Sequence, residues 1–290
     1  MLRLVIAAVW ITVAGSAPGA AQSTPLDTGA HYASVHGIRT YYYVTGTGAP
    51  LVLLHGAFSN IETDFGAMLP ELGRTHRVIG IELQGHGHTV DTNRPLRYDS
   101  LADDVADLLA QLKVEHADFF GYSLGGAVAL HIALRHPALV RKFVFAGGAG
   151  FSPAGLYAGL LEGERNLKPE QLAGTPWQRA YARMAPHPEQ WAMLVEQIKD
   201  LDLTDAGIDT ARVKTIRAPG LLIIGDGDVV RPEHTVQMFR LLGGGVPADL
   251  QGIPNSQLAV LPGTTHVSLM AKGPWLVSMV NEFLAAPVRP

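Results

Sequence analysis

The chain has 290 residues, of which 47% are hydrophobic and 17% are charged. This length and composition are sufficient for one large α/β domain with an insertion. The net charge of −4 provides no basic field for nucleic acid, and the lack of cysteine excludes disulfides, thiolate metal ligands and a cysteine nucleophile.

The first 21 residues have the pattern of a secretory signal peptide. Arg3 precedes an apolar run from Leu4 to Ala14, and small residues follow up to Ala21. We expect cleavage after Ala21 and an exported protein, either periplasmic or secreted. The apolar run is short for a membrane span, so we expect no stable membrane insertion after cleavage. An uncleaved anchor is the alternative.

The first elements of the mature chain are predicted to be strands. Residues 31–36 and 38–45 alternate apolar and polar side chains, which predicts an antiparallel hairpin. The apolar segments 51–54 and 77–83 predict buried strands of a parallel sheet. The segment 61–72 between them predicts a helix.

Strands and helices then continue to alternate. A capping-box spacing at Ser100 predicts the start of a helix that continues to Leu112. Residues 117–120 and 140–146 predict strands, and 127–135 predict the helix between them. This alternation indicates a mostly parallel sheet with helices on both faces.

From residue 150 to about residue 210 the alternation stops. Prolines separate short helical pieces that are rich in apolar and aromatic residues, which predicts an inserted helical cap. The pattern resumes with strands at 221–224 and 257–261 and helices at 232–242 and 275–285. The predicted domains are a signal peptide (1–21), a core (22–149 and 211–290) and the cap (150–210).

The central motif is Gly-x-Ser-x-Gly, from Gly121 to Gly125, between a predicted strand and a predicted helix. In that context the motif is typical of a nucleophile elbow, in which a tight turn exposes the serine hydroxyl beside a helix N-terminus. Gly121 and Gly125 remove Cβ atoms that would clash in such a turn. We predict Ser123 as the nucleophile, with an ordinary glycine-serine turn as the alternative.

A serine nucleophile needs a histidine base and an acid that orients the histidine. With the order serine, acid, histidine, the base is His234 or His266 and the acid is Asp226 or Asp228. We predict His266, because it follows the last strand at the carboxyl edge of the sheet. We predict Asp228, because Asp226 directly follows the glycine that closes a strand and is expected to bind local backbone.

The oxyanion hole is predicted to use two backbone N–H groups, from Leu124 at the helix start and from Ala57 in the loop after the 51–54 strand. His55 is expected to brace that loop. The substrate pocket is predicted to include aromatic residues beside the nucleophile and in the cap. These are Phe58, Tyr122, Trp177, Tyr181 and Trp191.

Other polar residues are given structural interpretations. His86 and His88 could form a metal pair, but they lie in a glycine-rich loop with no second pair nearby, so packing is the preferred interpretation. Glu162 and Glu164 are interpreted as a solvated face. We predict neither a metal nor a cofactor.

The motifs together resemble those of the α/β-hydrolase family, in its cap-bearing branch, over almost the whole mature chain. The matching segments are His55-Gly56, Gly85-His86-Gly87, Gly121-Tyr122-Ser123-Leu124-Gly125-Gly126, Gly225-Asp226-Gly227-Asp228 and Gly263-Thr264-Thr265-His266. The resemblance implies the α/β-hydrolase fold and hydrolysis of an ester or a related acyl bond without a cofactor. Ser123 disfavours the haloalkane dehalogenases and epoxide hydrolases, which use an aspartate nucleophile. Glu82 and Thr89 replace the more usual Asp and Ser.

The expected function is therefore a secreted serine esterase, with a small-molecule hydrophobic ester as its partner. The apolar composition of the cap favours small to medium esters. Carbon–carbon bond hydrolases, amidases, lactonases and cofactor-free haloperoxidases share the same triad and stay open as alternatives. A ligand-binding protein without catalysis is a further alternative. The exact substrate and the oligomeric state are not determined by the sequence.

Overall fold

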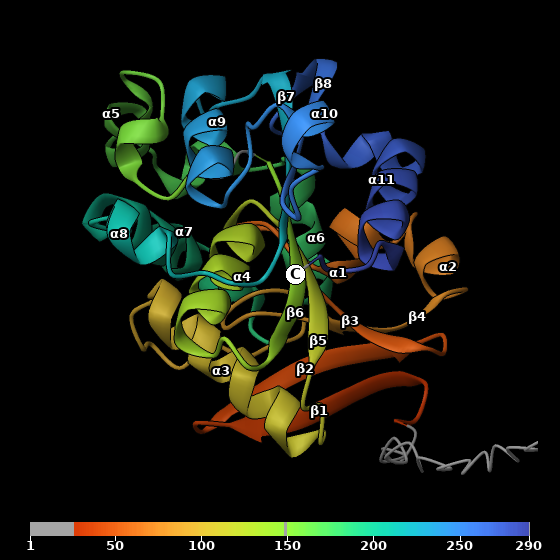
Figure 1. Cartoon of the computed structure of the whole chain (residues 1–290). Helices are drawn as coiled ribbons and strands as arrows, with labels where there is room; N and C mark the ends of the chain where they lie inside the picture. Colours follow the sequence, from red (N-terminus) through yellow and green to blue (C-terminus); the bar gives the residue numbers. More distant parts are fainter. Residues whose placement is uncertain (1–25, 148–149, 290) are drawn as a thin grey trace, which may run out of the picture.

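The computed structural model describes residues 26–147 and 150–289, so the predicted signal peptide lies outside the described residues. An eight-stranded sheet forms the centre, with α3 and α4 on one face and α1, α2 and α11 on the other (Figure 1). The predicted fold class is thereby confirmed. The strand order is β1-β2-β4-β3-β5-β6-β7-β8. The strands are β1 (Gly29–Val35), β2 (Ile38–Thr45), β3 (Ala49–Leu54), β4 (His76–Ile81), β5 (Ala117–Tyr122), β6 (Val140–Ala146), β7 (Gly220–Gly227) and β8 (Gln257–Thr265).

The helices cover both faces of the sheet and build the inserted segment. Two hydrophobic clusters, one on each face, contain most of the buried side chains. The helices are α1 (Ile61–Phe65), α2 (Leu69–Leu72), α3 (Tyr98–Gln111), α4 (Leu124–Arg135), α5 (Leu160–Arg165), α6 (Pro176–Met184), α7 (Trp191–Thr204), α8 (Thr210–Val213), α9 (Pro232–Leu241), α10 (Ala248–Gln251) and α11 (Gly273–Ala285).

The sheet is parallel except at its first edge. β1 and β2 form the predicted antiparallel hairpin, and β2 also pairs with β4 in the antiparallel direction. All strand pairs from β4 to β8 are parallel. Their carboxyl ends meet at one edge, where active sites of open parallel sheets are located.

Two helix predictions differ from the structure. The single helix expected over 61–72 is split into α1 and α2, because Pro70 cannot donate a backbone hydrogen bond to Gly66 and its ring would clash with that carbonyl. The capping box at Ser100 is wrong, because α3 already begins at Tyr98. Arg97 is its N-cap, without a side-chain cap. Ser100 is therefore an internal residue of the first turn.

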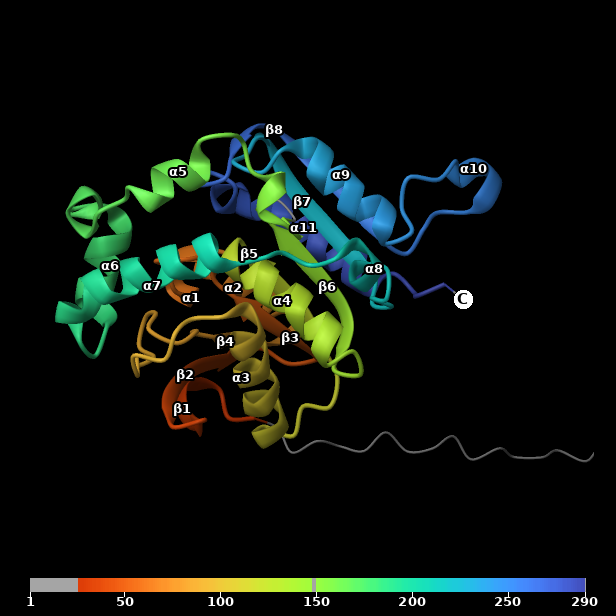
Figure 2. The same cartoon turned by 90° about the vertical axis from the view of Figure 1, so that its left-hand side faces the viewer.

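The segment between β6 and β7 contains α5, α6 and α7, which lie together outside the sheet (Figure 2). Its start is hydrogen-bonded to the loop after β7. Leu156 forms an isolated antiparallel bridge with Val230, and Arg231 N donates to Gly155 O at 2.8 Å. In the described part of the chain, no helix combines the length and hydropathy needed to cross a bilayer.

Candidate active site

The turn between β5 and α4 holds Ser123 in a strained backbone conformation. Its φ of 51° and ψ of −116° lie in a region that residues other than glycine rarely adopt, at a typical cost of about 1–3 kcal/mol. The neighbouring glycines make the turn possible. A Cβ on Gly121 would lie 2.2 Å from Gly125 O, and one on Gly125 would lie 2.1 Å from Leu54 O. This is the nucleophile-elbow geometry that the motif predicts.

Ser123, His266 and Asp228 form a continuous hydrogen-bonded chain. His266 Nε2 lies 2.9 Å from Ser123 Oγ, and His266 Nδ1 lies 2.9 Å from Asp228 Oδ1. Asp228 is 4% exposed, so its charge acts on the imidazole with little screening by water. The other candidate base, His234, is stacked on Phe151 with ring centroids 4.1 Å apart, away from this chain of groups.

The two aspartates after β7 have different partners. Asp226 accepts hydrogen bonds from the backbone N–H groups of Gly263 at 3.0 Å and Thr264 at 3.1 Å, and these bonds lower its pKa. Asp228 instead contacts the imidazole, and its Oδ1 also accepts from Val230 N at 3.2 Å. Asp226 thus ties the end of β7 to the loop that carries His266, as expected from its position after the strand.

His55 braces the loop after β3, as the sequence predicts. Its Nδ1 lies 2.8 Å from Gly56 O, and its Nε2 accepts from Leu83 N at 3.0 Å. The ring therefore donates from Nδ1. Burial lowers the pKa of His55 to about 3, so it stays neutral and cannot compete with His266 as a base.

Asp64 is a second support of the same loop, and the sequence analysis missed it. Asp64 Oδ2 accepts from Gly56 N at 2.8 Å, and its Oδ1 accepts from Ser59 Oγ at 2.7 Å. Burial raises the pKa of this carboxyl to about 6, against the lowering effect of these two bonds. The first bond fixes the backbone directly before Ala57, and the second holds the side chain of Ser59, two residues after it.

A cavity of about 620 Å³ opens beside Ser123 and His266. Its walls are mostly apolar, and the inserted segment supplies many of them: Leu156, Leu160, Leu161, Leu167, Leu172, Trp177, Ile198 and Leu201. Ala57 and Leu124, the residues predicted to provide the oxyanion N–H groups, also line it. The cavity is large enough for a small molecule and is closed off mainly by the inserted segment.

Two of the predicted pocket residues, Phe58 and Trp177, line this cavity, whereas Tyr122, Tyr181 and Trp191 are not among its described lining residues. Trp191 packs behind Phe58 and against Tyr181, with ring centroids 5.7 Å and 5.3 Å apart. Tyr122 lies under the triad, where its hydroxyl donates to His266 O at 3.0 Å. These three aromatic side chains are buried and pack against residues of the site, outside the lining of the cavity.

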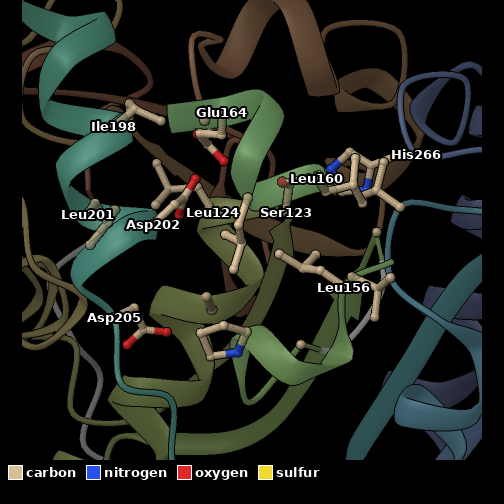
Figure 3. A pocket seen from close by; sticks show the side chains of 18 of the residues that line it. Ser123, Leu124, Leu156, Leu160, Glu164, Ile198, Leu201, Asp202, Asp205 and His266 are labelled. Carbon is tan, nitrogen blue, oxygen red and sulfur yellow. Dashed lines mark hydrogen bonds between the residues drawn. The ribbon is translucent and has the colours of Figure 1, made fainter. Parts of the chain in front are cut away.

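The interpretation of Glu164 as a solvated residue is wrong, because its carboxyl faces the cavity together with Asp202 and Asp205 (Figure 3). Tyr98 OH donates to Asp202 Oδ1 at 3.2 Å. Burial raises the pKa of Glu164 to about 8 and that of Asp202 in the same direction. No local motif marks these residues, since they come from three distant parts of the chain. Glu162, by contrast, is exposed and pairs with Arg165.

Comparison with known proteins shows the family to which the chain belongs. A family model described as alpha/beta hydrolase fold matches residues 49–197. The chain belongs to this family. It is 31% identical to the 2-hydroxymuconate semialdehyde hydrolase of Pseudomonas sp. (strain CF600), over 86% of this chain and 91% of that relative. It is also 31% identical to the human serine hydrolase BPHL, over 80% of this chain and 81% of that protein.

Solved structures agree with this assignment of the fold. A meta-cleavage product hydrolase from Pseudomonas fluorescens IP01 superposes with a TM-score of 0.65 at 23% identity, covering 88% of this chain and 97% of that one. The family model and the relatives above make the protein a serine hydrolase of the α/β-hydrolase fold that acts on a small molecule.

The histidine pair of this α/β-hydrolase has no metal-binding geometry. His86 is buried, its Nδ1 lies 2.9 Å from Gln84 O, and burial lowers its pKa to about 4. His88 instead contacts Glu82, whose Oε2 lies 2.9 Å from its Nδ1. Across residues 26–147 and 150–289 no three histidine or carboxylate side chains converge as metal ligands would.

Proposed function

We propose that the protein hydrolyses small carbonyl compounds through an acyl-enzyme on Ser123. In this mechanism Ser123 Oγ attacks the carbonyl carbon while His266 Nε2 accepts the hydroxyl proton. Asp228 keeps His266 in the tautomer that carries its proton on Nδ1, and it stabilises the imidazolium that forms. We assign the N–H groups of Ala57 and Leu124 as donors to the oxyanion. The observation that carries the proposal is the pair of 2.9 Å contacts through His266.

The comparisons favour a carbon–carbon bond as the bond that is broken. 2-Hydroxymuconate semialdehyde contains no ester or amide bond, so its hydrolysis must break a carbon–carbon bond. The relative named for that reaction matches most of this chain. We therefore place hydrolysis of a carbon–carbon bond next to an aldehyde or ketone carbonyl first. His266 would then return its proton to the departing carbon.

Hydrolysis of carboxylic esters is the second candidate, and the charge of the cavity favours it over the relative's own substrate. A muconate carries a carboxylate, which needs a cationic partner when it is withdrawn from water. The described residues that line the cavity include no lysine or arginine. A neutral or cationic ester meets no such penalty.

The two candidates can be separated by turnover measurements. A fluorophosphonate should label wild type at Ser123 and should not label Ser123→Ala, which should lose all turnover while staying folded. Values of kcat/KM for 2-hydroxy-6-oxodienoates and for 4-nitrophenyl esters then decide between the bond types. Labelling of a different serine, or turnover by Ser123→Ala, would show that the nucleophile is wrongly assigned.

A further inference from the structure

The cavity beside Ser123 carries charge of only one sign. Glu164, Asp202 and Asp205 line it, and no lysine or arginine is among its described lining residues. Lys199, on the same helix as Asp202, is instead paired with Glu196, with 3.0 Å between Nζ and Oε2. Because Ser123 opens into the same space, the molecule that contacts these acids is the substrate itself.

The acids form one connected group. Tyr98 OH donates to Asp202 Oδ1, and Glu164 and Asp202 line the same cavity. Burial and the neighbouring charge of Asp202 raise the pKa of Glu164, so this carboxyl tends to hold a proton. A buried charge costs free energy unless a partner compensates it. The group therefore gains most from a ligand that brings hydrogen-bond donors and positive charge.

The position of the acids identifies the part of the substrate that meets them. In Figure 3, His266 lies on one side of Ser123, and Glu164 and Asp202 lie on the other. His266 gives its proton to the leaving group, so the leaving group must be on the histidine side. The acyl group then extends in the opposite direction, past apolar residues such as Leu124, toward the acids (Figure 3).

We propose that the acyl part of the substrate ends in a protonated amine, which binds Glu164, Asp202 and Asp205. The apolar stretch between Ser123 and the acids holds the carbon skeleton of the acyl group. Acyl groups that end in a carboxylate are excluded by repulsion. This inference rests on the proposed acyl-enzyme and names the substrate class of that same site.

The test uses three 4-nitrophenyl esters with acyl groups of nearly equal size and different charge. They are the esters of 4-(aminomethyl)benzoic acid, 4-ethylbenzoic acid and, for the anion, 4-(carboxymethyl)benzoic acid. Hydrogen bonds to charged groups predict kcat/KM about 10–100-fold higher for the ammonium ester than for the neutral one. The carboxylate ester should be the slowest of the three.

Variants test whether Glu164 and Asp202 cause the preference for the ammonium ester. At pH 8, Asp202→Asn and Glu164→Gln should each reduce the ammonium-to-neutral ratio of kcat/KM at least ~5-fold. Glu162→Gln is the matched control, because Glu162 lies on the same helix but outside the cavity. An equal loss of the ratio in the control would overturn the inference, as would a wild-type ratio of one or less.

The ratio should also depend on pH. The titratable and charged neighbours of Glu164 are Asp202 and Lys199 of α7, Tyr98 of α3 and Asp205. Because the raised pKa keeps Glu164 largely protonated below about pH 8, the ammonium preference should increase between pH 7 and pH 8, where the benzylic ammonium of the substrate still keeps its proton. Division by the value for the neutral ester removes any pH dependence that the two esters share. A ratio that is constant in wild type would contradict the role of Glu164.

Failure of the inference is distinguishable from failure of the proposed function. If the neutral ester is hydrolysed and Ser123 is labelled, but the ammonium ester is not preferred, only the inference is wrong. If no ester is hydrolysed, binding of the corresponding methyl esters to Ser123→Ala is measured by calorimetry. Equal affinity for the ammonium and neutral methyl esters would then overturn the inference.

Discussion

Asp64 should show opposite effects on stability and activity. Its pKa is about 6 in the folded protein, against a reference value of 3.8. A shift of roughly two units corresponds to about 3 kcal/mol. Because the folded pKa is raised, the folded state binds this proton more tightly. The associated stability is fully present below about pH 4 and is lost as pH rises through 6.

The isosteric variant Asp64→Asn removes the charge but retains an acceptor for Gly56 N–H, and its amide can donate to Ser59. We therefore expect Asp64→Asn to be more stable than wild type by about 1–3 kcal/mol at pH 8, with little difference at about pH 3.5, below the pKa of the unfolded state. Urea unfolding at the two pH values measures this difference. A stability gain of equal size at both pH values would refute the argument from ionisation.

The same variant should be less active. The Asp64 charge lies close enough to His266 for the two to attract each other, so it also favours the imidazolium that forms during the reaction. Its removal should reduce kcat about 3–10-fold, which corresponds to roughly 1 kcal/mol. Asp64→Ala also frees Gly56 N–H and loosens the backbone around Ala57. It should reduce kcat about 100-fold, toward the loss seen when one oxyanion donor is removed. Wild-type kcat in Asp64→Ala would contradict this role.

Three further predictions follow from the site and the chain terminus. Asp228→Asn should reduce kcat far more than Asp226→Asn, with His266→Ala at least as damaging as Asp228→Asn; steady-state kinetics would contradict the assignment if Asp226→Asn were the worse of the two carboxylate variants. Activity should fall at acidic pH, because protonated His266 cannot accept the Ser123 proton; a pH profile of kcat/KM that is flat in the acid range would contradict this base. Protein recovered outside the cytoplasm should begin at or near Gln22, and intact residues 1–21 on it, detected by mass spectrometry, would favour an uncleaved anchor.

The catalytic chain could be predicted because its members follow strand ends. Ser123, Asp228 and His266 each come directly after a segment whose apolar pattern predicts a strand, and a parallel sheet brings such ends to one edge. The choice of Asp228 over Asp226 could also be made from the sequence, because Asp226 directly follows the last glycine of the strand and was expected to bind local backbone. Pro70 was a readable signal that interrupts the predicted helix, and its effect was overlooked.

The acids of the cavity could not be found in the same way. Tyr98, Glu164 and Asp202 belong to three helices whose relative positions depend on packing across the inserted segment. Glu164 shares its helix with exposed Glu162, and composition does not distinguish a carboxyl facing solvent from one facing a cavity. Asp64 was missed for the same reason, since its role depends on the path of the loop after β3.

The bridge between Leu156 and Val230 ties one wall of the cavity to the loop of the catalytic acid. Val230 N also donates to Asp228 Oδ1, so Val230 contacts both Leu156 and the catalytic aspartate. Outward movement of the segment that starts at Leu156 must either break this bridge or pull the Asp228 loop with it. Admission of a bulky substrate and alignment of His266 are then mechanically linked. A displacement at Leu156 that reaches Asp228 would therefore also disturb the orientation of His266.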